Sequence, residues 1–356
     1  MKKKIIFQVV THFDVGGAER IAFNIAKSKS QDFEYHVVEV AKGNSKYTEK
    51  MLAELKENGI AYHRSDVLNN KKAILSFPFR MKKLYDQYHP DVIQTHTEAP
   101  DLAVFLFHKF FPWCKFKLVR TLHNTKLWSQ WRFIGKLVEK YIQNCDANVS
   151  NSLAVTKAYV EAFGGEKNIR LIYNGFAPSN QIKYSGLVEG KLNILFAGRF
   201  VPQKGLDVLV EVIKRTNPNK FFFHVAGKGP LDDVVNEGVG KMQNVKIIPP
   251  IPNLSSYVGS FDYVIIPSVH EGLNSLSIEA SMNGTPAIVN DIAGLNETLP
   301  SDWKLKVTNN SVEQYLDILN VLSTLDYDHL KEYAFGFASC HFSISKMQSE
   351  YEKIYE

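Results

Sequence analysis

Cysteine is scarce in this chain of 356 residues, and long apolar runs are missing. The three cysteines, Cys114, Cys145 and Cys340, are scattered and form no Cys-x-x-Cys pair. This spacing argues against a disulfide framework or a zinc cluster and suits a reducing cytosol. No uncharged apolar stretch approaches the ~18 residues of a transmembrane helix. The apolar segment near the N-terminus is too short for a signal peptide, so we expect a buried strand there.

Two common nucleotide-binding patterns are also absent. No G-x-G-x-x-G follows the first predicted strand, so the fingerprint of nicotinamide and flavin enzymes is missing. The P-loop pattern G-x-x-x-x-G-K-[ST] does not occur either. The composition, with 45% apolar and 22% charged residues, is that of a globular protein. The length is sufficient for two α/β domains, each with its own core.

Short β-branched segments alternate with helix-like segments along most of the chain. Strands are predicted at residues 4–10, 35–41, 91–95, 117–122, 147–150 and 170–173, and then at 193–197, 221–226, 245–248, 263–267 and 287–290. Such alternation favours parallel sheets with right-handed crossovers. We therefore expect an α/β fold with Rossmann-like domains at 1–176 and 177–340, followed by a helix over 341–356.

The most informative segment follows the predicted strand at 263–267. Glu271 comes at the end of this strand, and Glu279 lies eight positions later, beyond a turn and a helix start. Ligands of parallel sheets bind at this edge. Free N–H groups from Leu273 to Leu276 would favour a phosphate or a sugar hydroxyl, and Glu279 could accept hydrogen bonds from a vicinal diol. By itself, the segment is equally compatible with a surface helix carrying two solvated glutamates.

Cations and glycines follow other predicted strands. Arg199 and Lys204 come after the strand at 193–197, where positive charge suits a diphosphate leaving group; solvated loop residues are the alternative. Gly16 and Gly17 follow the first strand, where they would allow a ligand to approach the backbone closely, or form a plain tight turn.

Together these pieces resemble the retaining GT-B nucleotide-sugar glycosyltransferases that carry an E-x7-E motif. The resemblance covers nearly the whole chain and is strongest from residue 193 to 297. It is carried, in order, by Gly16-Gly17-Ala18-Glu19-Arg20, Tyr173-Asn174-Gly175, Ala197-Gly198-Arg199 with Lys204-Gly205, Ala226-Gly227-Lys228-Gly229-Pro230, the two glutamates, and Asn283-Gly284-Thr285-Pro286. It implies two Rossmann-like domains facing across a cleft, with the last helix crossing back to the N-terminal domain.

The resemblance also implies residue roles. Arg199 and Lys204 would bind the diphosphate, Glu279 the ribose, and Glu271 the donor sugar. His96 would project from a strand end near the anomeric carbon, where an imidazole could assist proton movement; His123 is the alternative. The implied catalytic set is His96, Glu271, Arg199 and Lys204, and the implied donor-binding set is Gly16, Gly17, Arg199, Lys204, Gly227, Gly272, Leu273, Asn274, Ser275, Leu276 and Glu279. At Leu273 and Asn274 the chain departs from the commonest form of the motif.

The function implied by the resemblance is metal-independent and uses a nucleotide sugar, with no cofactor. A hexose or N-acetylhexosamine would pass, with retention, from a UDP-linked donor to a lipid-linked or polysaccharide acceptor in bacterial surface glycan synthesis. Asp326-Tyr327-Asp328 has the form of a metal-binding D-x-D motif, but lies far from any predicted strand end, so we expect a helix start. A sugar-nucleotide epimerase and a non-catalytic nucleotide-sugar-binding module remain alternatives.

Positive charge is concentrated in the first half of the chain. Residues 1–178 contain 27 Lys and Arg against 17 Asp and Glu, whereas the remainder contains 15 against 20. Aromatic and basic residues are interspersed over 71–83 and 105–120, which suits an anionic membrane surface; packing in the core is the alternative. No nucleic-acid-binding pattern accompanies these residues. We expect a cytoplasmic protein associated peripherally with the inner face of the cell membrane.

Overall fold

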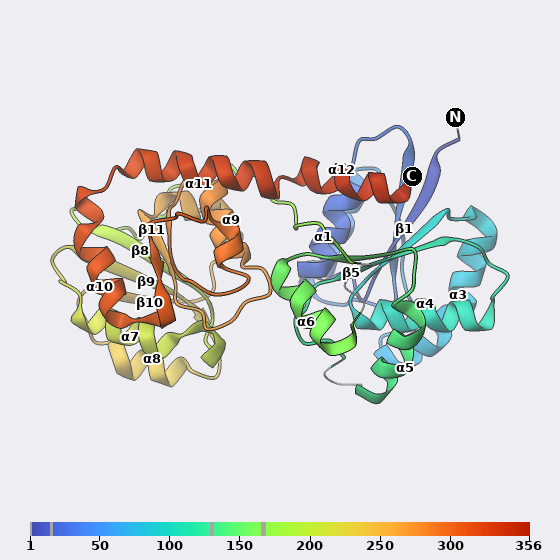
Figure 1. Ribbon diagram of the computed structural model, residues 1–356, viewed down its shortest axis with the longest axis horizontal. Coiled ribbons are helices and arrows are strands. Elements are labelled where there is room, and N and C mark those ends of the chain that lie inside the picture. The colour runs from blue at the N-terminus through green and yellow to red at the C-terminus, as the bar shows by residue number, and fades with distance from the viewer. Residues whose placement is uncertain (1, 15–16, 129–131, 165–168) are drawn as a thin grey trace. The chain divides into compact units, whose positions relative to one another are not determined.

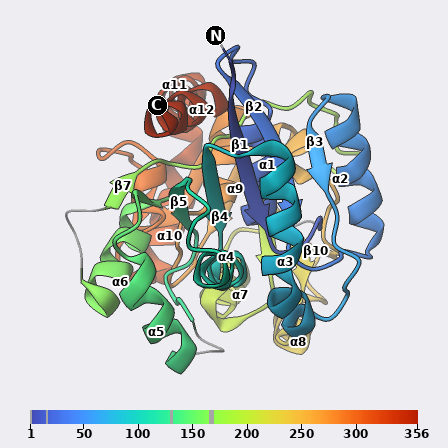
Figure 2. The same ribbon diagram turned by 90° about the vertical axis from the view of Figure 1, so that its right-hand side faces the viewer.

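The computed structural model describes residues 2–14, 17–128, 132–164 and 169–356. The chain forms two compact units, each built around a parallel sheet (Figures 1 and 2). The first unit comprises Met1–Gly175 together with Ile344–Glu356, and the second comprises Phe176–Ser343. The expected α/β fold with two parallel-sheet domains is confirmed.

The first unit contains a seven-stranded sheet in the order β3-β2-β1-β4-β5-β6-β7. Its strands are β1 (Lys4–Val10), β2 (Phe33–Glu39), β3 (Ala61–His63), β4 (Val92–His96), β5 (Lys117–Leu122), β6 (Ala147–Ser150) and β7 (Ile169–Leu171). Its helices are α1 (Gly17–Ala26), α2 (Lys46–Glu57), α3 (Asn70–Tyr88), α4 (Glu98–Phe110), α5 (Arg132–Ile142), α6 (Leu153–Phe163) and α12 (Ile344–Tyr355). One apolar core lies beneath α1, α2 and α12 and a second beneath α3 and α4.

The C-terminal helix α12 belongs to the first unit although it is last in the sequence. Its apolar stripe is buried at Met347, Tyr351 and Ile354. The hydroxyl group of the buried Tyr355 contacts Gln8 and Gln94 on β1 and β4, and that of Tyr351 contacts Thr121 on β5. The helix begins at Ile344, three residues later than the expected boundary, because Ser343 has extended backbone angles between two helices.

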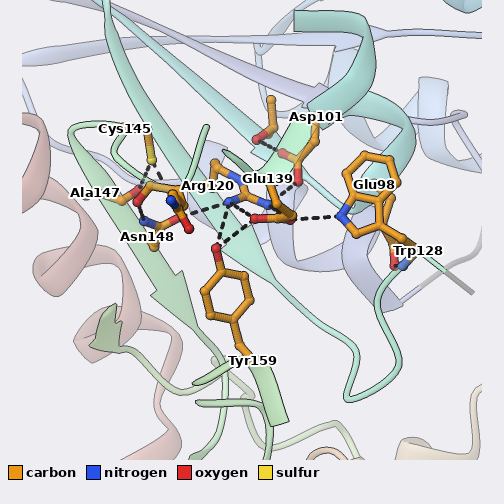
Figure 3. A network of polar contacts seen from close by, with 11 residues as sticks. Glu98, Asp101, Arg120, Trp128, Glu139, Cys145, Ala147, Asn148 and Tyr159 are labelled. Atoms are coloured by element: carbon orange, nitrogen blue, oxygen red, sulfur yellow. Dashed lines mark hydrogen bonds and ion pairs between the residues drawn. The ribbon is translucent and has the colours of Figure 1, made fainter. Parts of the chain in front are cut away.

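A buried polar network joins α4, α5 and α6 to the sheet of the first unit (Figure 3). The Arg120 guanidinium on β5 donates to Asp101 at 2.8 Å and to Glu139 at 2.7 Å. Glu139 on α5 also accepts from the Trp128 indole at 2.8 Å and the Tyr159 hydroxyl at 2.7 Å. Burial acts to raise the pKa of Glu139, but the Arg120 charge and the hydrogen bonds from Arg120, Trp128 and Tyr159 together outweigh burial, so the pKa is lowered. The charged network therefore fixes how α5 sits on the sheet.

The second unit contains a six-stranded sheet in the order β10-β9-β8-β11-β12-β13. Its strands are β8 (Leu192–Arg199), β9 (Phe221–Lys228), β10 (Val245–Ile248), β11 (Tyr263–Ile266), β12 (Ala287–Asn290) and β13 (Lys306–Val307), and its α-helices are α7 (Leu206–Arg215), α8 (Asp232–Val239), α9 (Ser275–Met282), α10 (Val312–Val321) and α11 (Tyr327–Phe342). One continuous apolar core fills this unit. The strands β8 and β9 pair along their whole length, so Arg199 ends its strand beside Lys228.

Most strands occur where the alternating pattern predicts them, with two exceptions. The short strands β3 and β13, of three and two residues, have no apolar run long enough to predict them. The expected helix start at the D-x-D sequence is confirmed, because Asp326 caps α11 and accepts from the backbone N–H of His329. None of the described helices is long and apolar enough to cross a membrane.

Candidate functional site

A cavity of about 470 Å³ lies at the carboxyl edge of the sheet in the second unit. The ends of β8, β9 and β11 and the start of α9 line it. It brings together nine residues of the implied set: Arg199, Lys204, Gly227, Glu271, Leu273, Asn274, Ser275, Leu276 and Glu279. Gly272 is not among the lining residues and packs beside Gly294.

The cationic side of this cavity contains Arg199, Lys204 and Lys228. Arg199 and Lys228 are the paired last residues of β8 and β9 and are both exposed. Lys228 belongs to the motif at residues 226–230, but the resemblance implies no role for its side chain. The signal that would have identified it is register, because parallel neighbours that end together bring their last side chains to one edge.

Lys204 and Glu271 form an ion pair within the cavity, with the ammonium nitrogen 2.6 Å from a carboxylate oxygen. Their side chains are only 20% and 9% exposed. Lys204 is held there by a tight turn, since the following Gly205 has φ +63° and any Cβ would lie 1.9 Å from the carbonyl oxygen of Pro267. The two residues therefore neutralise each other, and an anionic ligand would compete with Glu271 for the ammonium group.

The N-terminus of α9 opens onto the same cavity. Asn274 caps the helix by accepting from the N–H of Ser277 at 2.9 Å, and its own N–H donates to the carbonyl of Gly294 at 2.9 Å. The expected run of free N–H groups from Leu273 to Leu276 is therefore interrupted at Asn274. Among the described residues no acceptor is recorded for the N–H groups of Ser275 and Leu276, which remain available to a ligand.

Glu279 lies in the second turn of α9 and lines the cavity. Burial raises the pKa of its carboxyl group to about 7. Among the described residues, no hydrogen bond or ion pair of this carboxyl group is recorded. A half-buried carboxyl group without a protein partner indicates that a hydrogen-bond donor outside the protein is needed to satisfy it.

The glycines of the implied set have different surroundings. A Cβ at Gly227 would lie 2.1 Å from the carbonyl oxygen of Gly198 and 2.3 Å from the Phe200 ring, so packing within the unit requires glycine here. Gly17 begins α1 in the first unit, and a Cβ there would meet nothing within 4 Å. Gly16 lies outside the described residues.

His96 is in the first unit and is placed differently from the expectation. It is the last residue of β4 and is 1% exposed, rather than projecting from the strand end. Its Nε2 lies 2.7 Å from the Gln8 amide oxygen, and its Nδ1 lies 3.1 Å from Nε2 of His123. Because the amide oxygen can only accept, His96 Nε2 donates and His123 donates to His96 in turn.

His123 is half-buried, and its Nδ1 is the ring nitrogen left as an acceptor by this arrangement. Burial lowers the pKa of His123 to about 4, so the pair is neutral at physiological pH. Neighbouring strands β4 and β5 bring the two imidazoles together, since His96 pairs in register with Thr121. Of the two histidines, His123 is the more accessible.

Among the described residues, no group of three or more His, Cys, Asp or Glu side chains is gathered as a metal site. The charged groups that line the cavity are the ammonium groups of two lysines, one guanidinium group and two carboxyl groups, and amide and hydroxyl side chains lie among them. This is a set that complements phosphates through its cations and hydroxyl groups through its carboxylates.

Comparison with known protein families assigns both halves of the chain. Residues 15–180 match the Glycosyltransferase Family 4 model, and residues 191–324 match the model for Glycosyl transferases group 1. The chain carries the paired domains of a glycosyltransferase. The second of these domains contains the cavity and all nine of its predicted lining residues.

Relatives of known sequence agree with this assignment. The chain is 26% identical over 309 residues to the capsular polysaccharide biosynthesis glycosyltransferase CapH of Staphylococcus aureus, covering 81% of each protein. It is also 29% identical over 288 residues to an uncharacterized 41.2 kDa protein in the cps region of Klebsiella pneumoniae, covering 75% of this chain and 78% of that protein.

Solved structures confirm the GT-B type of fold. A glycosyltransferase from Rickettsia africae superposes with a TM-score of 0.79 at 20% identity, covering 100% of this chain and 98% of that one. Anabaena HepE in complex with UDP-glucose superposes with a TM-score of 0.77 at 18% identity, covering 98% of each chain. At these identities the likeness establishes the fold alone.

Proposed function

We propose that this chain is a retaining glycosyltransferase that moves a hexose or N-acetylhexosamine from a UDP-linked donor to a lipid-linked or polysaccharide acceptor. The single observation that carries the proposal is the cavity that gathers Arg199, Lys204, Glu271 and Glu279 at one sheet edge. Its volume of about 470 Å³ lies within the range of roughly 300–1,000 Å³ typical of small-molecule sites.

Each part of the donor has a matching group in this proposal. The diphosphate lies against Arg199 and Lys204, with the N–H groups at the start of α9 nearby, and Lys228 adds a third cation. The ribose hydroxyl groups donate to the unpaired Glu279 carboxylate. When the diphosphate engages Lys204, the Glu271 carboxylate is released to accept from hydroxyl groups of the sugar.

The proposed reaction needs no further reagent. The bond between the anomeric carbon and the β-phosphate oxygen breaks, and its electron pair leaves with the diphosphate. The acceptor hydroxyl oxygen bonds to the anomeric carbon on the same face, and its proton passes to the leaving diphosphate. The cations hold the charge that grows on the leaving group, which is why no metal ion is required in this proposal. His96 and His123 remain proposed contributors to positioning and proton movement near the sugar.

The relatives support the choice of acceptor. CapH is named for capsular polysaccharide biosynthesis, and a second relative lies in a cps region. We propose that the first unit binds a surface-glycan acceptor, that the second binds the donor, and that the protein works at the inner face of the cell membrane. The excess of positive charge in the first half of the chain supports this location.

The test begins with calorimetric binding of UDP, UDP-sugars and sugar nucleotides with other bases, all in the presence of a metal chelator. Lys204→Ala should weaken UDP binding about tenfold or more, whereas Lys220→Ala, an exposed lysine outside the cavity, should not change it. If wild type and Lys204→Ala bind UDP with equal affinity, the cavity is not the donor-binding site that we propose.

Turnover distinguishes the competing functions. Wild-type protein with the best donor and a lipid extract should yield a glycosylated product by mass spectrometry, with the donor's anomeric configuration by NMR. Donor conversion without any acceptor would instead identify an epimerase. Donor binding without conversion in any extract would identify a binding module, and product with the opposite configuration would refute retention.

A further inference from the structure

The helix α5 presents apolar side chains to the solvent and a charged side chain to the core. Phe133 is 84% exposed and Leu137 60% exposed, and Ile134 and Tyr141 are exposed beside them. On the opposite side, Val138 and the carboxylate of Glu139 are buried. A helix on the surface of a globular protein normally has the reverse arrangement, with the apolar stripe inward.

This orientation of α5 is fixed by contacts on its inner side. Glu139 accepts from Arg120, Trp128 and Tyr159 in the buried network (Figure 3). Gly135 packs so closely that a Cβ would lie 2.2 Å from Cγ of Trp128. Turning the apolar side inward would leave the Arg120 guanidinium buried without one of its two carboxylates, which is strongly unfavourable.

The apolar surface continues from α5 across α4 and α3. A cavity of about 570 Å³ lies between the three helices, and every lining residue except Lys71 is apolar. Its walls include Ile74 and Leu75 from α3 and Leu102 and Phe105 from α4. The two segments expected to contact a membrane are only partly available, because Phe77 and Phe107 are buried in the core. Leu75, Phe79, Phe110 and Trp113 of these segments are exposed.

The exposed charges around this surface have almost entirely one sign. The exposed basic residues on α3, α4 and α5 are Lys71, Lys72, Lys83, Lys109, Arg132, Lys136 and Lys140. The exposed carboxylate described on these helices, Asp86, is paired with Lys82 at 2.6 Å. Cations therefore surround an apolar patch, and a second copy of the same face would bring like charges together.

We propose that this surface, the exposed side chains of α3, α4 and α5 together with the cavity between them, docks on an anionic lipid bilayer. We call it the α5 face. Phe133 and Leu137 enter the boundary between headgroups and acyl chains, and Lys136, Lys140 and Arg132 lie at the level of the lipid phosphates. This inference rests on the proposed function in one respect: a lipid-linked acceptor would be located in such a bilayer.

The experiment measures sedimentation of the full chain with vesicles of phosphatidylcholine, with or without an equimolar share of phosphatidylglycerol. Wild type should bind the anionic vesicles, and the double change Phe133→Ser with Leu137→Ser should weaken binding about tenfold or more. The double change Lys136→Gln with Lys140→Gln should weaken binding only to anionic vesicles. A matched control, Ile182→Ser with Val321→Ser, removes similarly exposed apolar residues of the second unit and should bind as wild type does.

Insertion is measured separately with Phe133→Trp, whose added indole should be quenched by brominated phosphatidylcholine, whereas that of Ile182→Trp should not. Equal vesicle binding by all variants, or no quenching of Phe133→Trp, would overturn the proposal. The proposal would also be overturned if the wild-type protein forms dimers in solution and the double change Phe133→Ser with Leu137→Ser makes it monomeric. That result would assign the α5 face to contact with a second copy of the chain. Calorimetric UDP binding, measured without vesicles, reports on the proposed function independently of these results.

Discussion

The carboxyl group of Glu279 provides the sharpest prediction, because burial opposes its charge while a ligand would require it. Its pKa is raised from 4.5 to about 7 in the folded protein. Between these values the folded state holds a proton that the unfolded state has released, so stability is lost as pH rises through this window. Glu279→Gln removes this penalty. The variant should be more stable than wild type by about 1 kcal/mol at pH 5 and about 3 kcal/mol at pH 8.5.

The same substitution should weaken ligand binding. If the Glu279 carboxylate accepts from ribose hydroxyl groups, the amide loses charge-assisted hydrogen bonds, and UDP affinity should fall about tenfold at pH 8. The loss should be smaller at pH 6, where wild type must first release its proton. Stability and affinity therefore change in opposite directions, as expected where a functional group is retained at a cost in stability.

Urea denaturation and calorimetry, each at several pH values, measure the two effects. The free energies of unfolding and of UDP binding are compared between wild type and variant at each pH. In these differences the contributions from titration of the ligand and of other protein groups cancel. Glu237→Gln, an exposed glutamate on α8, controls for the loss of one negative charge in the same unit. A stability gain that is independent of pH would contradict the raised pKa of Glu279, and UDP binding as tight as that of wild type would contradict its contact with the ligand.

Three other substitutions test the packing and the charges. Gly227→Ala should lower stability by about 1–3 kcal/mol because its Cβ would overlap the backbone of β8; thermal denaturation should show no comparable loss for Gly17→Ala, where space is open. Glu271→Gln should leave UDP binding unchanged or tighter, since Lys204 loses a competing anion, but abolish sugar transfer; weaker UDP binding by calorimetry would contradict this. Glu139→Gln should cost about 3–5 kcal/mol in urea denaturation by leaving a buried guanidinium undercompensated, and an unchanged midpoint would show that the network contributes little.

Local sequence patterns were sufficient for most of the architecture. Alternating β-branched segments predicted the principal strands, and their spacing predicted parallel sheets in two domains. Most residues that line the cavity of the second unit could be predicted from their positions after strands. Parallel strands end at a common edge of the sheet whatever the details of side-chain packing. Arg199 and Glu271 come from different strand ends, and they meet for this reason.

Relations between side chains that are distant in the sequence were not predictable in this way. No local pattern shows that Lys204 and Glu271 form an ion pair, or that Lys228 lies beside Arg199, since both depend on sheet register. His96 has the position of a strand-end residue, but it is buried and forms hydrogen bonds with Gln8 on β1 and with His123, which directly follows β5. The two contacts join residues that are 27 and 88 positions apart in the sequence.

Periodicities of two and 3.6 residues are sufficient to locate the longer strands and helices, and a position at or soon after a strand end is sufficient to place Arg199 and Glu271 at a sheet edge. Which side of each helix or strand is covered depends instead on how the elements pack against one another. The periodicity of α5 shows two faces but not their direction, and the buried Arg120 network turns the charged face inward and leaves Phe133 and Leu137 in the solvent. Burial is a property of the whole packed unit, so no local segment contains that information.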